Sequence, residues 1–262
     1  MRNTQETTSY RSAENDWWRP LLWTLCAVSV ALVAVSAIVP VLLGVGPGHR
    51  GSLVRLFFDV ADERNLPAWW NSGLLLLAAF FCAGVGQLRR RCGADGRAGW
   101  LAWWGIAALL GLMSLDEFAG FHEHLDRVWD AVVGENPLRA YEWLMLGVPL
   151  GLAVVVFVWL CSRTLPRTTA RLLMGGLLVL FTGALVLEAV PLFLDLPRNS
   201  AGFVAAYHAE ELFEFIGSSM LAVAPLASLG VRRPTVGGGL EVDWVPGPRV
   251  RTDPDRQAVP MR

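Results

Sequence analysis

The chain has 262 residues, of which 54% are hydrophobic and 17% are charged, and its formal net charge is −1. A typical soluble domain carries about 25% charged residues, so this composition is depleted in charge and enriched in apolar residues. The near-zero net charge excludes a protein that binds nucleic acid through bulk positive charge, and the apolar content excludes a mainly disordered chain. The composition therefore predicts a membrane protein, with the lipid bilayer as its partner.

Six segments are long and apolar enough to cross a bilayer, which takes about 20 residues of helix. None shows the alternating pattern of barrel strands, and helices satisfy their backbone hydrogen bonds internally in lipid. The segments lie near residues 18–45, 68–88, 98–124, 140–161, 172–194 and 203–230. We therefore predict an all-α fold, a polytopic bundle of six transmembrane helices over residues 18–231. A polar tail (1–17) precedes it, and a Gly-, Pro- and Arg-rich tail (232–262), expected to be disordered, follows it.

The arginines predict the orientation of this bundle, because the chain contains no lysine. With the N-terminus in the cytoplasm, 16 of the 22 arginines fall on the cytoplasmic side. The positive-inside rule therefore favours both termini in the cytoplasm. The cysteines are expected to be small packing residues, because their positions match no zinc motif and suggest no disulfide. They are Cys26, Cys82, Cys92 and Cys161.

Ionisable residues gather in three of the predicted spans. At a rise of 1.5 Å per residue, Asp116, Glu188 and Glu214 all come out about 22–24 Å from the cytoplasmic ends of their helices, in the outer leaflet. On the third helix, Glu117 and His124 lie seven residues apart and so share a face, as do Asp116 and Glu123. Each charge at this depth costs roughly 2.5–3.5 kcal/mol on insertion scales, so these groups are expected to face the bundle interior or water.

The leading hypothesis is a metal-dependent membrane enzyme whose site opens toward the outer leaflet. Carboxylate and imidazole are ligands that zinc, manganese or iron accept, although the spacing here matches no diagnostic motif. An unligated carboxylate, Glu210, would act as general base on metal-bound water. The substrate would be a lipid or another hydrophobic small molecule. The candidate ligands are Asp116, Glu117, His124, Glu188, His208, Glu211 and Glu214.

Two alternatives stay open. The same acids could form a proton- or cation-binding site of a coupled carrier, although the inner halves of the helices look nearly free of polar groups that would continue the path. They could also serve a non-catalytic role in structure or in assembly with a membrane partner. The sequence leaves enzymatic turnover and oligomeric state open.

Three motifs resemble those of a set of bacterial multi-pass membrane proteins that carry no functional name. They are Phe58–Ser72, Ser114-Leu115-Asp116-Glu117 with His122-Glu123, and Glu210-Glu211-Leu212-Phe213-Glu214. The likeness covers roughly residues 50–220. It implies a bacterial inner (plasma) membrane protein and implies no activity.

Overall fold

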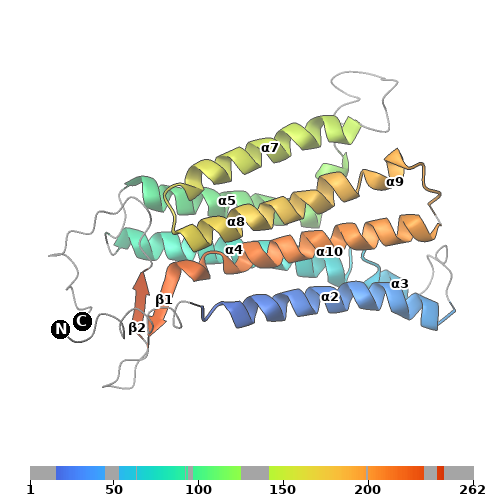
Figure 1. The fold of residues 1–262 in the computed structure, drawn as a ribbon, viewed down its shortest axis with the longest axis horizontal. Helices are drawn as coiled ribbons and strands as arrows, with labels where there is room; N and C mark the ends of the chain where they lie inside the picture. The colour runs from blue at the N-terminus through green and yellow to red at the C-terminus, as the bar shows by residue number, and fades with distance from the viewer. Residues whose placement is uncertain are drawn as a thin grey trace, which may run out of the picture.

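The computed structural model describes residues 16–44, 53–62, 64–91, 93, 97–124, 142–198, 200–232 and 241–244. Within this part of the chain, six helices are long and apolar enough to cross a membrane, which confirms the predicted helical bundle. They run side by side along the long axis of the molecule (Figure 1). The spans are built on α2 (Arg19–Leu42), α4 (Leu66–Arg91), α5 (Arg97–Ala119), α7 (Glu142–Ser162), α8 (Arg167–Phe181) and α10 (Ala201–Val223).

Short elements connect or extend these helices. They are α3 (Leu53–Phe58), the 3₁₀ turns η1 (His122–His124) and η4 (Leu226–Ser228), the π-helical turn η3 (Thr182–Leu187), α9 (Val190–Phe193), and the strands β1 (Leu229–Arg232) and β2 (Glu241–Trp244). The two strands pair antiparallel. The segment Glu241–Trp244, expected to lie in the disordered tail, is thus a strand, because β1 at the end of α10 offers it a hydrogen-bonding edge. Most of both predicted tails lies outside the described residues.

Helix α10 occupies the centre of the bundle and is the most buried of the six spans. It packs against α2, α4, α8 and η3. Its contact with α8 is close because two glycines meet there. A Cβ on Gly176 would lie 3.0 Å from the carbonyl oxygen of Gly217, and a Cβ on Gly217 would lie 2.6 Å from the backbone nitrogen of Leu180. Small residues at a helix crossing let two backbones approach, which is how helices associate in lipid.

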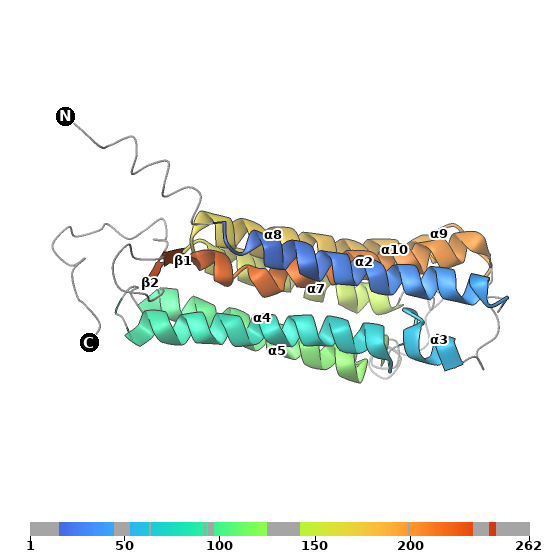
Figure 2. The ribbon, with the colours of Figure 1, turned by 90° about the horizontal axis from the view of Figure 1, so that it is seen from below.

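Helices α4 and α5 form a second pair, which Figure 2 shows lying beside the group of α2, α8 and α10. Leu75, Trp103 and Ile106 are fully buried in the core. Gly86 admits Trp103, since a Cβ on this glycine would lie 2.9 Å from the Cβ of the tryptophan. Helix α7 contacts α5 and α8 and is the least buried span. Most of its surface is therefore left for lipid.

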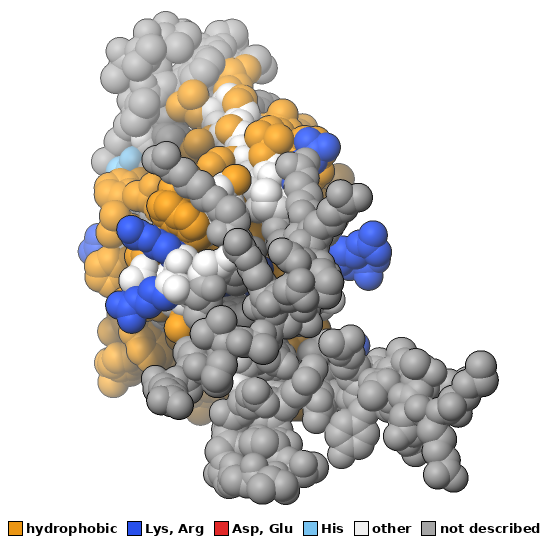
Figure 3. All heavy atoms as spheres, turned by 90° about the vertical axis from the view of Figure 1, so that its left-hand side faces the viewer, with side chains coloured by type: hydrophobic (Ala, Val, Ile, Leu, Met, Phe, Trp, Pro, Cys, Tyr) orange, Lys and Arg blue, Asp and Glu red, His pale blue; other side chains and the backbone are white. Residues whose placement is uncertain are grey.

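Arginine side chains gather at one end of the bundle, seen end-on in Figure 3. We call this the arginine-rich end and the opposite one, which carries η1 and α9, the distal end. The arginines are contributed by the start of α2, the end of α4, the connection from α7 to α8 and the first part of α8. They are Arg19, Arg89, Arg90, Arg91, Arg163, Arg167 and Arg171.

The third span is shorter than predicted, because α5 ends at Ala119 rather than near residue 124. Gly120 follows with φ 63°, a left-handed conformation that glycine adopts without strain and that commonly ends helices. The chain then turns into η1 (His122–His124). The prediction that Glu117 and His124 share one helical face was therefore wrong, as was the pairing of Asp116 with Glu123, since both pairings required an unbroken helix.

Candidate functional site

Five glutamates from three helical segments form what we call the carboxylate cluster. Its central member is Glu214, on α10, whose electrostatic neighbours are the other four carboxylates. All five side chains are partly buried. The members are Glu117 on α5, Glu188 after η3, and Glu210, Glu211 and Glu214 on α10. Each of these residues was a candidate in the sequence analysis, and the structure brings them together.

The π-helical turn η3 decides which side chain faces α10. The backbone N–H of Glu188 donates to the carbonyl oxygen of Gly183 over 3.2 Å, five residues back. In a regular α-helix the residue one turn after Gly183 would be Leu187. The extra residue of the π turn thus brings an acid, rather than a leucine, into line with Gly183. Such π turns occur frequently at functional sites.

Gly183 lies directly against the acidic part of α10. A Cβ on this residue would be 2.7 Å from the carbonyl oxygen of Glu210 and 2.9 Å from Cγ of Glu214. Only a residue without a side chain permits this approach. The glycine therefore positions the π turn, and Glu188 beyond it, beside the carboxylates of α10.

Two buried polar residues adjoin the cluster. Nδ2 of Asn71, on α4, donates a hydrogen bond to Oε1 of Glu117 over 3.0 Å. Asn71 is only 1% exposed, and its Oδ1 has no hydrogen-bond partner among the described residues. The same is true of Oγ of Ser218, which is fully buried one turn beyond Glu214 on α10. Buried polar atoms are nearly always satisfied, so two unsatisfied oxygens beside a cluster of acids indicate a place where a proton or another ligand binds.

Asn71 is not among the candidate residues predicted from the sequence. Its signal was a single amide within an apolar helix, directly after Trp69-Trp70. Polar side chains inside a span usually face the bundle interior. This rule points to Asn71, but only the packing of α4 on α5 shows that the amide reaches Glu117.

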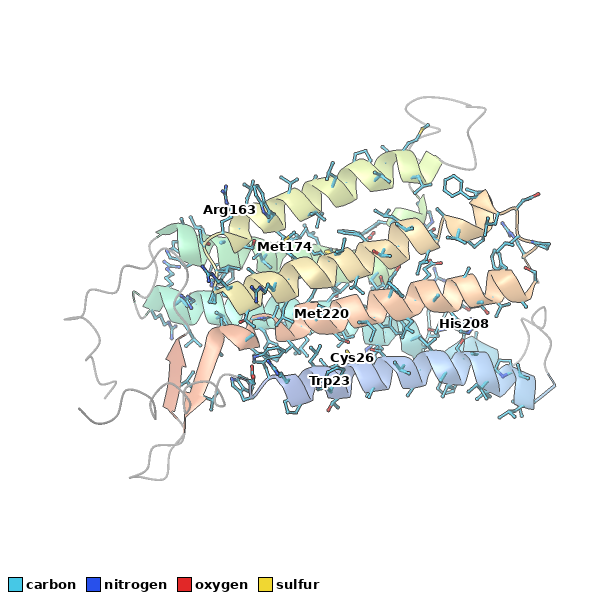
Figure 4. The ribbon with its side chains drawn as sticks, viewed as in Figure 1. Trp23, Cys26, Arg163, Met174, His208 and Met220 are labelled. Atoms are coloured by element: carbon cyan, nitrogen blue, oxygen red, sulfur yellow. The ribbon has the colours of Figure 1, made fainter. Side chains whose placement is uncertain are left out.

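His208, one turn before Glu211 on α10, joins α10 to α2 (Figure 4). Its Nδ1–H donates to the carbonyl oxygen of Val204 over 2.8 Å, so Nε2 accepts from the hydroxyl of Ser36 over 3.2 Å. The Ser36 hydroxyl in turn accepts from the backbone N–H of Val60 over 3.1 Å. Both ring nitrogens of His208 are therefore engaged in holding helices together.

Two more candidate ligands lie at the distal end. Oδ1 of Asp116 accepts from the backbone N–H of His122 over 3.0 Å, and Oδ2 accepts from its Nδ1 over 3.1 Å. Nδ1 of His124 donates to the carbonyl oxygen of Gly120 over 2.6 Å. With these residues engaged in the turn after α5, the described part of the chain contains no group of three or more His, Cys, Asp or Glu placed to hold a metal ion.

Fold and site together define a membrane protein with six helices able to span the bilayer and a carboxylate cluster among them. The chain belongs to the family described as "Domain of unknown function (DUF8692)", whose profile matches residues 24–229. The match covers every helix able to cross the membrane, apart from the first turn of α2. Comparisons with the curated proteins and with the solved structures gave no match.

Proposed function

We propose that the protein is a proton-coupled membrane carrier in which the carboxylate cluster binds and releases protons. One observation carries this proposal: within the part of the chain that the structure describes, the electrostatic neighbours of Glu214 are all carboxylates. Like charges at close range cannot all stay ionised inside a bilayer, so at least part of the cluster must hold protons. The unpartnered oxygens of Asn71 and Ser218 are suitable acceptors for the O–H of a protonated carboxyl group.

Buried polar groups continue from the cluster toward the arginine-rich end, where the sequence suggested almost none. Ser218 comes first. The next residue, Ser219, follows, and its hydroxyl oxygen lies 3.5 Å from the hydroxyl oxygen of Ser29 on α2. The Ser29 hydroxyl also accepts a hydrogen bond from the indole N–H of Trp70 over 3.0 Å. Nearer the arginine-rich end, Thr169 is fully buried and Arg89 is 2% exposed. These groups favour the carrier over a purely structural role, because a structural cluster needs no polar groups beyond it.

The metal-dependent enzyme receives less support from the geometry. It required imidazole and carboxylate in one first coordination shell, but His208 and His124 each donate from Nδ1 to a backbone carbonyl and His208 also bonds Ser36. The described residues include no group able to hold a metal. A hydrophobic or lipid molecule remains in the proposal only as a cargo for proton-coupled transport.

The proposal includes an orientation and a location. The arginine-rich end would face the cytoplasm, because the positive-inside bias favours it, and the distal end would face outward. The membrane would be a bacterial inner membrane, as the resemblance of the sequence implies. With this orientation the carboxylate cluster takes up protons from the outside.

Proton flux into liposomes tests the proposal. The wild type, Glu214→Gln and the control Asp62→Asn, which changes an exposed acid, are reconstituted with a pH-sensitive dye inside. Infrared spectra record protonated carboxyl groups of the same samples across the pH range. We expect flux and a pH-dependent carboxyl signal in the wild type and in the control. In Glu214→Gln we expect flux to fall by about 10²-fold, since a positioned proton-transfer group contributes at least that much.

Two results would overturn the proposal. The first is a folded wild type without a pH-dependent carboxyl signal and without flux above that of empty liposomes. The second is a flux that requires sodium ions and leaves the internal pH unchanged, which would make the cluster a cation site.

A further inference from the structure

His122 is held over the distal end of α5 by two hydrogen bonds to one carboxylate. Gly120 turns the chain back, and Asp116 then accepts from both the backbone N–H and the Nδ1–H of His122, over 3.0 and 3.1 Å. An imidazole fixed in this way keeps Nδ1 toward Asp116. Nε2 is then the ring nitrogen that can exchange a proton with a third group.

The same imidazole is exposed and is also an electrostatic neighbour of two members of the carboxylate cluster. Its side chain is 46% exposed. It is nevertheless an electrostatic neighbour of Glu117 on α5 and of Glu210 on α10. Glu210 in turn is a neighbour of Glu214, the central member of the cluster. One ring is therefore almost half exposed and is at the same time an electrostatic neighbour of two partly buried acids.

We infer that His122, positioned by Asp116, is the group that transfers protons between the distal surface and the carboxylate cluster. The inference rests on the proposed function. In each transfer, water on the distal side gives a proton to the ring. The Nε2–H bond then breaks and an O–H bond forms on the Glu210 carboxylate, the proton passing through intervening water. The ring returns to its neutral form and Glu210 becomes a neutral acid, which passes the proton to Glu214.

The charges around the ring agree with this role. The acids that face it are Asp116 and Glu117 on α5 and Glu210 on α10. Helix α7 also packs against η1 and begins at Glu142, while η1 itself includes Glu123 and His124. Histidine titrates near pH 6.5, so among these residue types it can both accept and donate a proton near neutral pH.

The test compares His122→Ala with His124→Ala. Both residues lie in η1, but Nδ1 of His124 donates to the Gly120 carbonyl. His122→Ala keeps the backbone N–H that donates a hydrogen bond to Oδ1 of Asp116, so the turn is expected to remain. Flux into liposomes is measured with the external pH varied between about 5 and 8, the range in which histidine changes charge. Each measurement is repeated with imidazole added to the medium.

We expect His122→Ala to lower the flux by about 10²-fold, by the same proton-transfer estimate, and added imidazole to restore part of it. His124→Ala should behave as the wild type. A structural role for His122 would give no rescue by imidazole, and that result would overturn the inference. So would a His122→Ala or His122→Gln protein with wild-type flux at every pH. If the inference about His122 fails in either way, loss of flux in Glu214→Gln would still support the proposed function. Absence of flux in the wild type would contradict both the proposed function and the inference about His122.

Discussion

The amide of Asn71 donates to the carboxylate of Glu117 over 3.0 Å and so joins α4 to α5 inside the membrane span. The asparagine is nearly fully buried, and its other amide atom has no partner among the described residues. This bond fixes the position of Glu117 against the acids of α10.

Replacing Asn71 should therefore destabilise the bundle. Asn71→Leu leaves Glu117 without its donor, and an unsatisfied buried polar group costs about 1–3 kcal/mol. Denaturant unfolding in detergent micelles measures the loss. A double-mutant cycle with Glu117→Ala isolates the pair, because alanine removes the acceptor of the Asn71 amide and residues in contact show non-additive effects. Strict additivity of the two substitutions would mean that the bond contributes nothing.

The close crossing of α8 and α10 predicts a sharp difference between glycines. Gly217→Ala places a methyl group 2.6 Å from a backbone nitrogen and should cost about 1–3 kcal/mol through overpacking. Gly73→Ala is the matched control, because its Cβ would meet nothing within 4 Å on α4 and alanine is the better helix former. Thermal unfolding of both variants checks this. Equal stability of the two would contradict the crossing described above.

Ser36 should matter for stability and not for proton flux. Ser36→Ala removes the partner of both the Nε2 of His208 and the backbone N–H of Val60. The loss should be about 1–3 kcal/mol, the cost of leaving buried groups unsatisfied. Flux per folded molecule is expected to equal that of the wild type, since this network lies outside the cluster. A selective loss of flux at unchanged stability would place His208 in the proton path instead.

Metal removal should change neither folding nor flux. Elemental mass spectrometry of the protein in lipid nanodiscs is expected to find no stoichiometric zinc, manganese or iron, and a chelator should leave the flux unchanged. The variants Glu211→Ala and His124→Ala serve as comparisons, because both residues were candidate ligands. Near-stoichiometric metal that is lost in both variants would revive the metal-dependent enzyme.

The six spans and the similar depth of Glu188 and Glu214 could be predicted because both depend on position along the helix axis. Apolar length identifies a span, and a constant rise per residue places an acid at its depth. That Glu188 and Glu214 are electrostatic neighbours agrees with that arithmetic. Depth needs no knowledge of neighbours.

The other features depend on rotation and packing, which one sequence does not display. His124 does not share a helical face with Glu117, because Gly120 adopts a left-handed φ of 63° and ends the helix between them. Many glycines within helices keep a helical φ, so the sequence alone does not show this. The role of Asn71 needs the contact of α4 with α5. His208 was listed with the acids as a candidate metal ligand, whereas its Nε2 bonds the hydroxyl of Ser36 on α2.

The π turn between Gly183 and Glu188 also has a consequence for comparing members of the family. In a family member whose helix contains the π turn, the acid five residues after this glycine faces α10. In a member with a regular α-helix, an acid four residues after the glycine would occupy the same place. A column-by-column alignment would score the second chain as having lost its glutamate. The number of residues between the glycine and the next acid is therefore a better marker of this site than the identity of the residue aligned with position 188.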